Sequence, residues 1–376
     1  MDIDHDFDAG SIEVLSADAP DDVALALRGD SDAGFRQWFC FRALGLRGVD
    51  ARLSIVDASE ATYPDAFDGY RVVASYDRRR WFRVPTSYDG ERLVIEHTPR
   101  TDDVMYAYFA PYPLARRERL LRRAARAPWV RHEVIGRTVL GRELSMLSFG
   151  EEGRDKLQLW VVARQHPGET MAEWLAEGLV TRLLDDDDPT VAAVLSRAVV
   201  RIVPCMNPDG ASLGNHRTNA AGTDLNRAWL QPDAELSPEV LAARGRMEQT
   251  GVDAFLDVHG DERNPYCFLA GAEGNPGYGE RLRALEDLFE TSLCRQSPDF
   301  QAEYGYPRDE PGGGDLRTAN NYVGEMFDCL SFTVEMPFKD SATMPDEVNG
   351  WSPERSMHLG QATLDALEEC LDALRE

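Results

Sequence analysis

The sequence is poor in several features that would indicate a particular location or partner. Among its 376 residues there are only two lysines, Lys156 and Lys339, although arginine is frequent. It contains no apolar run of about 18 residues, the length from which a membrane-spanning helix is recognised. The N-terminal segment MDIDHDFDAG is acidic and lacks the apolar core of a signal peptide. We therefore predict a cytoplasmic protein that does not associate with membranes.

Motifs that pair cysteines are also missing. The six cysteines are scattered and show none of the CxxC spacing of zinc ribbons or redox motifs. They are Cys40, Cys205, Cys267, Cys294, Cys329 and Cys370. Cysteines of this kind are small, buried apolar side chains in a reducing compartment, so no disulfide framework is expected.

Positive charge is in deficit. The 40 lysines and arginines are outnumbered by 66 aspartates and glutamates, which gives a formal net charge of −26. Such a surface repels nucleic-acid phosphates and anionic lipids, so neither is expected as a partner. An acidic substrate would require a local basic pocket. The apolar fraction of 43% still allows a large core, and the length favours two domains.

Residues 1–113 have the pattern of an all-β domain. In the segment VDARLSIVDA, every second residue from Val49 to Ile55 is apolar. The segments ERLVIEHTP and DVMYAYFAPYP alternate in the same way, and Asp89-Gly90 provides a turn signal between such runs. Short alternating strands separated by turns predict a small N-terminal β-sandwich.

Residues 114–128, LARRERLLRRAARAP, have the pattern of a basic amphipathic helix that connects two domains. Its arginines could form a docking patch. A solvent-exposed helix face at a domain junction is the commoner explanation for such a charge run, and we expect it here.

Residues 129–376 show a different pattern. Four short apolar runs, LQLWVVA, AVVRIVP, DAFLDVH and CLSFTVE, resemble strands that are buried on both faces, as in the parallel centre of an α/β sheet. Helical patterns separate them. We therefore predict an α/β domain with a mixed, largely parallel-centred sheet flanked by helices.

Side chains that bind metals follow several of these runs. His166 and Glu169 come after the first run, His259 after the third, and Glu335 ends the fourth. Ligands of open α/β sheets bind outside the carboxyl ends of the strands, so these side chains are expected at one edge. Two imidazoles and a carboxylate, from His166, Glu169 and His259, are a donor set for catalytic zinc. Glu335 could then act as general base on a water molecule.

Each of these residues also has a simpler explanation when it is taken alone. Glu169 could be an acid in a first helical turn, and His259 a buried core histidine. Their joint placement favours the metal site. The polar segment 207–227 adds Arg217 and Arg227, whose planar guanidinium groups suit carboxylates and oxyanions. A surface loop could also carry these arginines without a function.

The motifs HPGE, NPDG, GNHRTNAAGTDLNR, DVHG and FTVEMPF occur in this order. Together they resemble the zinc metallocarboxypeptidases, and more narrowly the cytosolic carboxypeptidase subfamily, which includes tubulin deglutamylases and bacterial relatives. The N-terminal segments QWFCFR and YAYFAPYP are similar to the β-sandwich domain of that subfamily. The resemblance therefore covers most of the chain, and it implies a zinc carboxypeptidase fold after a β-sandwich.

The resemblance also implies a role for each matching residue. His166, Glu169 and His259 would bind one Zn²⁺ per chain. Arg217 would polarise the scissile carbonyl and stabilise the oxyanion. Asn226 and Arg227 would clamp the terminal carboxylate of the substrate, and Glu335 would be the general base.

Two features of the family have no unique counterpart in this sequence. The mobile tyrosine that closes over the substrate could be Tyr304, Tyr306 or Tyr322, of which we choose Tyr306. Subfamily members prefer a C-terminal Glu or Asp, which a basic residue recognises. Arg317 or Arg308 could do this, and we choose Arg317, although either could be an ordinary surface residue.

The expected activity is hydrolysis of the C-terminal peptide bond of a peptide or protein, with a preference for C-terminal Glu or Asp. One alternative is a zinc amidohydrolase that acts on N-acyl amino acids or cell-wall peptides. An alternative of another class is a non-catalytic module in which the β-sandwich binds a partner. The presence of His166, Glu169, His259 and Glu335 together argues against the last. The sequence predicts no oligomeric state.

Overall fold

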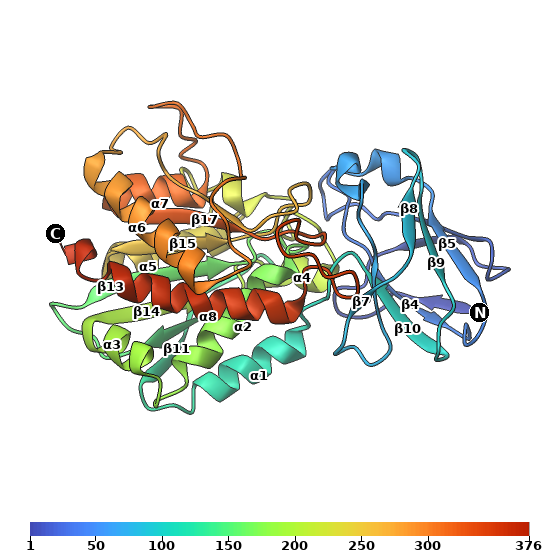
Figure 1. The fold of residues 1–376 in the computed structure, drawn as a ribbon, viewed down its shortest axis with the longest axis horizontal. Coiled ribbons are helices and arrows are strands. Elements are labelled where there is room, and N and C mark those ends of the chain that lie inside the picture. The colour runs from blue at the N-terminus through green and yellow to red at the C-terminus, as the bar shows by residue number, and fades with distance from the viewer. Residues whose placement is uncertain (376) are drawn as a thin grey trace.

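The computed structural model describes residues 1–375 and contains two domains that lie side by side (Figure 1). The N-terminal domain, coloured blue to cyan, is made of strands and short 3-10 turns. The larger domain carries a central sheet between layers of helices. No helix within residues 1–375 is long and apolar enough to cross a membrane.

The N-terminal domain consists of two five-stranded sheets, with the orders β1–β4–β10–β6–β7 and β2–β3–β5–β9–β8. Leu53 and Ile55 are buried on β5 and Arg52 is exposed, as the alternating pattern predicts. Val49 lies before this strand and is 37% exposed, so the alternation begins two residues later than expected. The predicted all-β fold is confirmed. The strands are β1 Asp2–Asp4, β2 Glu13–Ser16, β3 Val23–Ala26, β4 Cys40–Leu44, β5 Ala51–Ile55, β6 Val73–Ser75, β7 Phe82–Arg83, β8 Thr86–Tyr88, β9 Leu93–His97 and β10 Asp103–Ala107.

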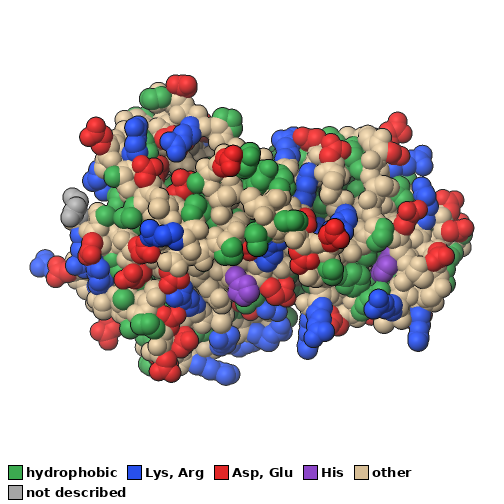
Figure 2. All heavy atoms as spheres, in the orientation of Figure 1, with side chains coloured by type: hydrophobic (Ala, Val, Ile, Leu, Met, Phe, Trp, Pro, Cys, Tyr) green, Lys and Arg blue, Asp and Glu red, His purple; other side chains and the backbone are tan. Residues whose placement is uncertain are grey.

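The helix α1, Leu114–Ala124, follows the last strand of this domain. Leu120 and Leu121 are buried, and the arginines at 119, 122 and 123 are exposed, as expected of a solvated basic face. Blue side chains accordingly gather at the lower edge of Figure 2, where α1 lies in Figure 1. Arg117 departs from this expectation because it is buried and pairs with Glu173 of the next domain. Helical periodicity indicates which face is apolar, but it does not reveal that a buried arginine has an acidic partner.

The second domain contains a seven-stranded sheet with the order β11–β12–β14–β13–β15–β17–β16. Its four central strands, β14, β13, β15 and β17, are parallel to one another, and the remaining pairs are antiparallel. The mixed, largely parallel-centred sheet is therefore confirmed. The strands are β11 Val130–Arg137, β12 Glu143–Phe149, β13 Leu157–Ala163, β14 Ala198–Val203, β15 Ala254–Val258, β16 Phe268–Ala270 and β17 Leu330–Glu335.

The sheet separates two hydrophobic cores. On β13, Leu159 and Val161 belong to the core that contains α2, α3, α6 and α8, whereas Trp160 and Val162 belong to the core that contains α5 and α7. This double burial explains why the strand is apolar without interruption from Leu159 to Ala163. The helices are α2 Thr170–Leu183, α3 Pro189–Arg197, α4 Pro208–Leu213, α5 Pro238–Thr250, α6 Glu280–Gln296, α7 Ala319–Phe327 and α8 Pro353–Cys370.

The helices α2 and α8 approach each other through glycines. A Cβ atom at Gly178 would lie 2.1 Å from the carbonyl oxygen of Met357, so alanine there requires a backbone shift. We expect Gly178→Ala to lower the free energy of unfolding by roughly 1–3 kcal/mol, the usual cost of overpacking. The control is Gly245→Ala on α5, where nothing lies within 4 Å of an added Cβ. This control should stabilise the protein by about 0.5–1 kcal/mol. Urea unfolding measures the free energy of unfolding of both variants. Equal values for the two variants would contradict the close packing inferred at Gly178.

Candidate active site

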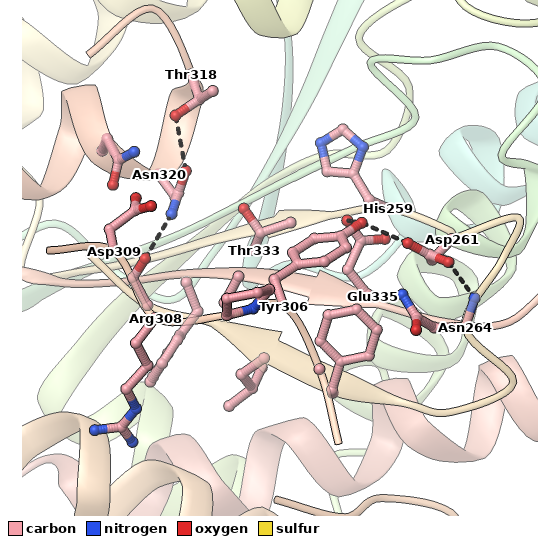
Figure 3. A pocket seen from close by; sticks show the side chains of 18 of the residues that line it. His259, Asp261, Asn264, Tyr306, Arg308, Asp309, Thr318, Asn320, Thr333 and Glu335 are labelled. Carbon is pink, nitrogen blue, oxygen red and sulfur yellow. Dashed lines mark hydrogen bonds between the residues drawn. The ribbon is translucent and has the colours of Figure 1, made fainter. Parts of the chain in front are cut away.

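A cavity of about 850 Å³ lies where β13, β15 and β17 end. His166, Glu169, His259 and Glu335 all line it, so the structure brings together the four residues that the sequence places after three different strands. Tyr63 of the N-terminal domain lines it as well. Figure 3 shows His259, directly after β15, near Glu335, the last residue of the neighbouring strand β17.

A buried arginine fixes the HPGE turn. Arg164, directly after β13, has a left-handed backbone with φ of 57°. Its guanidinium donates to the carbonyl of Pro167 (2.9 Å) and to the carboxylate of Glu173 (2.6 Å). Gly168 donates its N–H to the carbonyl of His216 (2.7 Å), and a Cβ at Gly168 would lie only 2.5 Å from Nδ1 of His216. The turn is therefore held against α2 on one side and against the 207–227 loop on the other.

Two imidazoles face one carboxylate. Nδ1 of His166 lies 2.6 Å from Oε1 of Glu169, and Nδ1 of His259 lies 2.7 Å from Oε2. The three side chains are buried, and their ligand atoms all lie within 4.8 Å of one another. This donor set suits a catalytic zinc ion, which takes three protein ligands of the N and O type.

The second nitrogen of each imidazole also has a carboxylate partner. Nε2 of His166 lies 3.0 Å from Oδ1 of Asp224, and Nε2 of His259 lies 2.9 Å from Oδ2 of Asp257. Histidines that bind metals usually donate their other N–H to such a group, which fixes the tautomer and leaves Nδ1 free for the metal. Sequence reasoning missed both aspartates. Asp257 could have been found, because residues two apart on a strand share a face.

The charges of these groups are strongly coupled. Burial opposes ionisation of Glu169, but His166 and His259 hold its pKa well below the ordinary range. Burial likewise opposes ionisation of Asp224, but His166 and Arg217 hold its pKa below the ordinary range. Both carboxylates are therefore negative near neutral pH, as a metal ligand and its outer partner need to be.

Glu335 lies at the end of β17 with one carboxylate oxygen toward Tyr306. Its Oε1 lies 3.2 Å from the Tyr306 hydroxyl oxygen, and its buried Oε2 has no hydrogen-bond partner among the described residues. Burial raises the pKa of Glu335 well above its ordinary value. A cation held by the neighbouring ligands would act in the opposite direction, because positive charge favours the carboxylate.

Arg217, Asn226 and Arg227 also line the cavity. Nε of Arg217 donates to Asp224 (2.8 Å), and one of its terminal nitrogens donates to the Tyr63 hydroxyl (2.9 Å). The amide of Asn226 lies 3.2 Å from Nε2 of His259, and Arg227 donates to the Asn226 carbonyl (2.7 Å). The structure thus brings Arg217, expected to be catalytic, and the two residues expected to bind substrate to the same cavity as the candidate metal ligands.

The three candidate tyrosines occupy different places. The Tyr306 hydroxyl points between Glu335 and Asp261, to which it donates at 2.6 Å (Figure 3). Tyr304 lines the cavity and stacks on Tyr266. Tyr322 lies on α7 in the core and is not among the residues that line the cavity. Of the three, only Tyr306 contacts a residue predicted to be catalytic.

The two arginines considered for recognition of an acidic C-terminal side chain also lie in different places relative to the cavity. The guanidinium of Arg317 pairs with Asp315, its side chain is 61% exposed, and the residue is not part of the cavity wall. Arg308 does line the cavity and points away from Glu335 (Figure 3). The choice between the two could not be made from the sequence because both lie in one irregular segment.

Acidic residues line the part of the cavity around Arg308. They include Glu273, Glu286 and Glu290, which sequence reasoning missed. Burial raises the pKa of Glu286 to about 7, and the positive charge of Arg308 opposes this rise. Glu286 accepts hydrogen bonds from the Tyr278 hydroxyl (2.6 Å) and from the Ala272 N–H (3.1 Å).

Two family models match the chain. Residues 3–109 match the cytosolic carboxypeptidase N-terminal domain, and residues 119–347 match the zinc carboxypeptidase family.

The chain is also similar to whole proteins. It is 42% identical over 368 residues to an uncharacterized protein of Zymomonas mobilis, covering 98% of this chain and 96% of that one. It is 24% identical over 361 residues to cytosolic carboxypeptidase 6 of Caenorhabditis elegans, covering 88% and 77%.

Two solved structures share its fold along nearly their whole length. A metallo-carboxypeptidase from Burkholderia cenocepacia has a TM-score of 0.96, 46% identity and 99% coverage of both chains. A metallo-carboxypeptidase from Pseudomonas aeruginosa, in complex with (2-guanidinoethylmercapto)succinic acid, has a TM-score of 0.98, 46% identity and full coverage of both chains.

These matches cover both domains and agree with the geometry of the cavity. They support a peptidase hydrolase, so the alternative of a non-catalytic β-sandwich module is not retained. The chain belongs to the zinc carboxypeptidase family and carries the N-terminal domain of the cytosolic carboxypeptidases.

Proposed function

We propose that this protein removes the C-terminal residue of peptides or proteins with one zinc ion per chain. The observation that carries the proposal is the lining of one cavity by the His166, Glu169 and His259 cluster, Glu335, and the arginines of the 207–227 loop. The six cysteines are free thiols, which supports a reducing, cytoplasmic location as part of the same proposal.

The proposed reaction distributes distinct tasks over the chain. Zinc, when bound by the three ligands, would polarise the scissile carbonyl and lower the pKa of water. Glu335 takes a proton from the attacking water and passes it to the leaving amine, so that one C–N bond breaks and one C–O bond forms. Arg217 donates to the oxygen on which negative charge develops.

The exopeptidase character depends on recognition of the terminal carboxylate. Arg227 lines the cavity beside Asn226, and its planar donors match a carboxylate. We propose that these two residues hold that carboxylate and thereby place the last peptide bond over the metal. The alternative of a zinc amidohydrolase shares the metal chemistry but needs no such clamp.

The side-chain preference has two candidate forms. We propose that a C-terminal Glu or Asp is preferred and that Arg308 recognises it, because Arg308 lines the cavity and Arg317 does not. The second candidate is a preference for C-terminal Arg or Lys. It is favoured by Glu273, Glu286 and Glu290 in the cavity wall, and by the guanidino ligand of the Pseudomonas aeruginosa structure.

Metal content tests the ligand set. We expect about one zinc per purified chain, as for a catalytic site of this type, and a loss of most of it in Glu169→Gln. Zinc should also raise the thermal midpoint of the wild type, because it binds only the folded state. The control is Asp186→Asn, in the exposed acidic run 185–187, which should keep the full zinc content. Elemental analysis and thermal melts measure both. A full zinc content in Glu169→Gln would contradict the assignment.

The general base is tested by Glu335→Gln, which keeps the shape of the side chain. We expect zinc content to stay unchanged and kcat to fall by roughly 10²- to 10⁴-fold, the usual contribution of a general base. Glu303→Gln is the matched control, since Glu303 is an exposed acid of the cavity wall and should retain activity. Full activity of Glu335→Gln would eliminate the proposed mechanism.

A peptide panel tests the clamp and the side-chain preference together. The peptides differ only in the last residue, which is Glu, Asp, Arg, Lys or Ala, and each has a C-terminally amidated counterpart. We expect acidic termini to give the highest kcat/KM and amidated peptides to be cut poorly. Arg308→Ala should lower kcat/KM for Glu termini by about 10-fold or more, because a charge-assisted pair is worth roughly 1.5–3 kcal/mol. Arg317→Ala should have no effect.

Two outcomes of the panel would redirect the proposal. Faster cleavage of Arg and Lys termini would favour the second candidate and the acidic wall. Equal cleavage of amidated and free peptides would remove the carboxylate clamp and favour an amidohydrolase.

A further inference from the structure

The N-terminal domain reaches into the loop that carries Arg217. The carboxylate of Asp30 accepts hydrogen bonds from three consecutive backbone N–H groups, those of His216 (2.6 Å), Arg217 (2.7 Å) and Thr218 (2.8 Å). It also accepts the Thr218 hydroxyl at 3.0 Å. Asp30 is only 7% exposed. A single buried side chain of the β-sandwich domain thus satisfies the backbone at the centre of a catalytic-domain loop.

The same domain contacts the side chain of Arg217. The Tyr63 hydroxyl accepts a hydrogen bond from a terminal nitrogen of Arg217 (2.9 Å), while Asp224 accepts from Nε (2.8 Å). The ring of Phe35 lies 5.7 Å from the guanidinium carbon. The guanidinium is therefore held by its own domain at one edge and by the β-sandwich domain at another.

Tyr63 is itself held in place at the cavity wall. The guanidinium of Arg263 lies 5.0 Å from the centre of the Tyr63 ring, and Arg263 also pairs with Asp65 (2.7 Å). The backbone N–H of Tyr63 donates to Gln37 (3.0 Å). Burial raises the pKa of the Tyr63 hydroxyl to about 12, so it stays protonated and neutral beside Arg217.

These contacts have a physical consequence for catalysis. An arginine on a long loop has many conformations, and ordering it during the reaction would cost entropy. A donor that already points at the position of the developing charge avoids that cost, and displacements of about 1 Å remove much of its effect. The contacts of Asp30 and Tyr63 fix the backbone and the guanidinium, respectively.

We propose that Asp30 and Tyr63 are positioning residues for Arg217, so that the β-sandwich domain completes the active site. The proposal rests on the role proposed above for Arg217. The β-sandwich domain would then contribute to the peptidase reaction. Without this domain, three backbone N–H groups of the Arg217 loop would lose their acceptor, and the guanidinium would lose one hydrogen-bond partner.

The test compares Tyr63→Phe and Asp30→Asn with two matched controls in the same domain. Tyr88→Phe removes a hydroxyl that donates to the Gly90 carbonyl (3.1 Å). Asp57→Asn changes a carboxylate that accepts the Leu27 N–H (3.0 Å). Neither control residue lines the cavity.

We expect Tyr63→Phe and Asp30→Asn to lower kcat by roughly 10- to 100-fold, the scale of a small misplacement of a catalytic group. KM and zinc content should stay within about 2-fold of the wild type, since ground-state binding and the metal ligands are intact. Affinity for a phosphinic peptide, whose tetrahedral oxygen carries negative charge, should fall by the same factor as kcat. Both controls should behave like the wild type.

A double-mutant comparison separates positioning from a general loss of structure. In an Arg217→Gln background, Tyr63→Phe should cause no further loss of kcat, because its effect passes through Arg217. An undiminished loss in that background, or an unchanged kcat in the single variant, would overturn the proposal. If Asp30→Asn does not fold, Tyr63→Phe decides, since it keeps the aromatic ring. Full activity of Arg217→Gln alone would instead reject the role proposed for Arg217.

Discussion

The arrangement of the candidate metal ligands His166, Glu169 and His259 depends on a buried ionic network around Glu173. Its carboxylate accepts from Arg164, directly after β13, and from Arg117 on α1, and all three side chains are at most 8% exposed. Removing one member would leave an unpaired buried charge at a cost of about 3–5 kcal/mol, so the network strongly disfavours other arrangements of the turn. Because Arg164 also holds the Pro167 carbonyl, this network sets the direction in which His166 leaves the sheet.

Residues of both domains determine the shape of the cavity. Asp30 and Tyr63 contact the Arg217 loop. The ring of Phe338 lies 6.3 Å from that of His216 in the same loop and stacks on Tyr108 at 4.6 Å, and the carbonyl of Phe338 accepts from the buried Arg83 (2.7 Å). Phe338 follows the end of β17 closely, so the β-sandwich domain braces the segment after Glu335 as well. Buried residues of both domains accordingly belong to one continuous hydrophobic cluster.

The predictability of each part follows from the range of the interactions that create it. The strand β13 was predictable because its neighbouring residues Leu159 and Trp160 face two different cores, which requires consecutive apolar residues from Leu159 to Ala163. Asp257 could be inferred locally, because it lies on β15 two residues before His259, which directly follows that strand. Asp224 and Asp30 could not be inferred from neighbouring residues, because their partners lie on loops whose relative positions depend on the packing of the whole molecule.

The sequence by itself determined the all-β character of the first domain, the four central strands of the second sheet, the edge of that sheet at which polar residues gather, and the chemical types of the metal-ligand candidates. These properties depend on local periodicity and on the order of motifs along the chain, and both can be read directly from the sequence. Only the tertiary structure decided that Arg308 rather than Arg317 faces the cavity, that Tyr306 contacts Glu335, and that the first domain holds Arg217. Side-chain direction in irregular segments depends on distant partners, and sequence spacing carries no information about them.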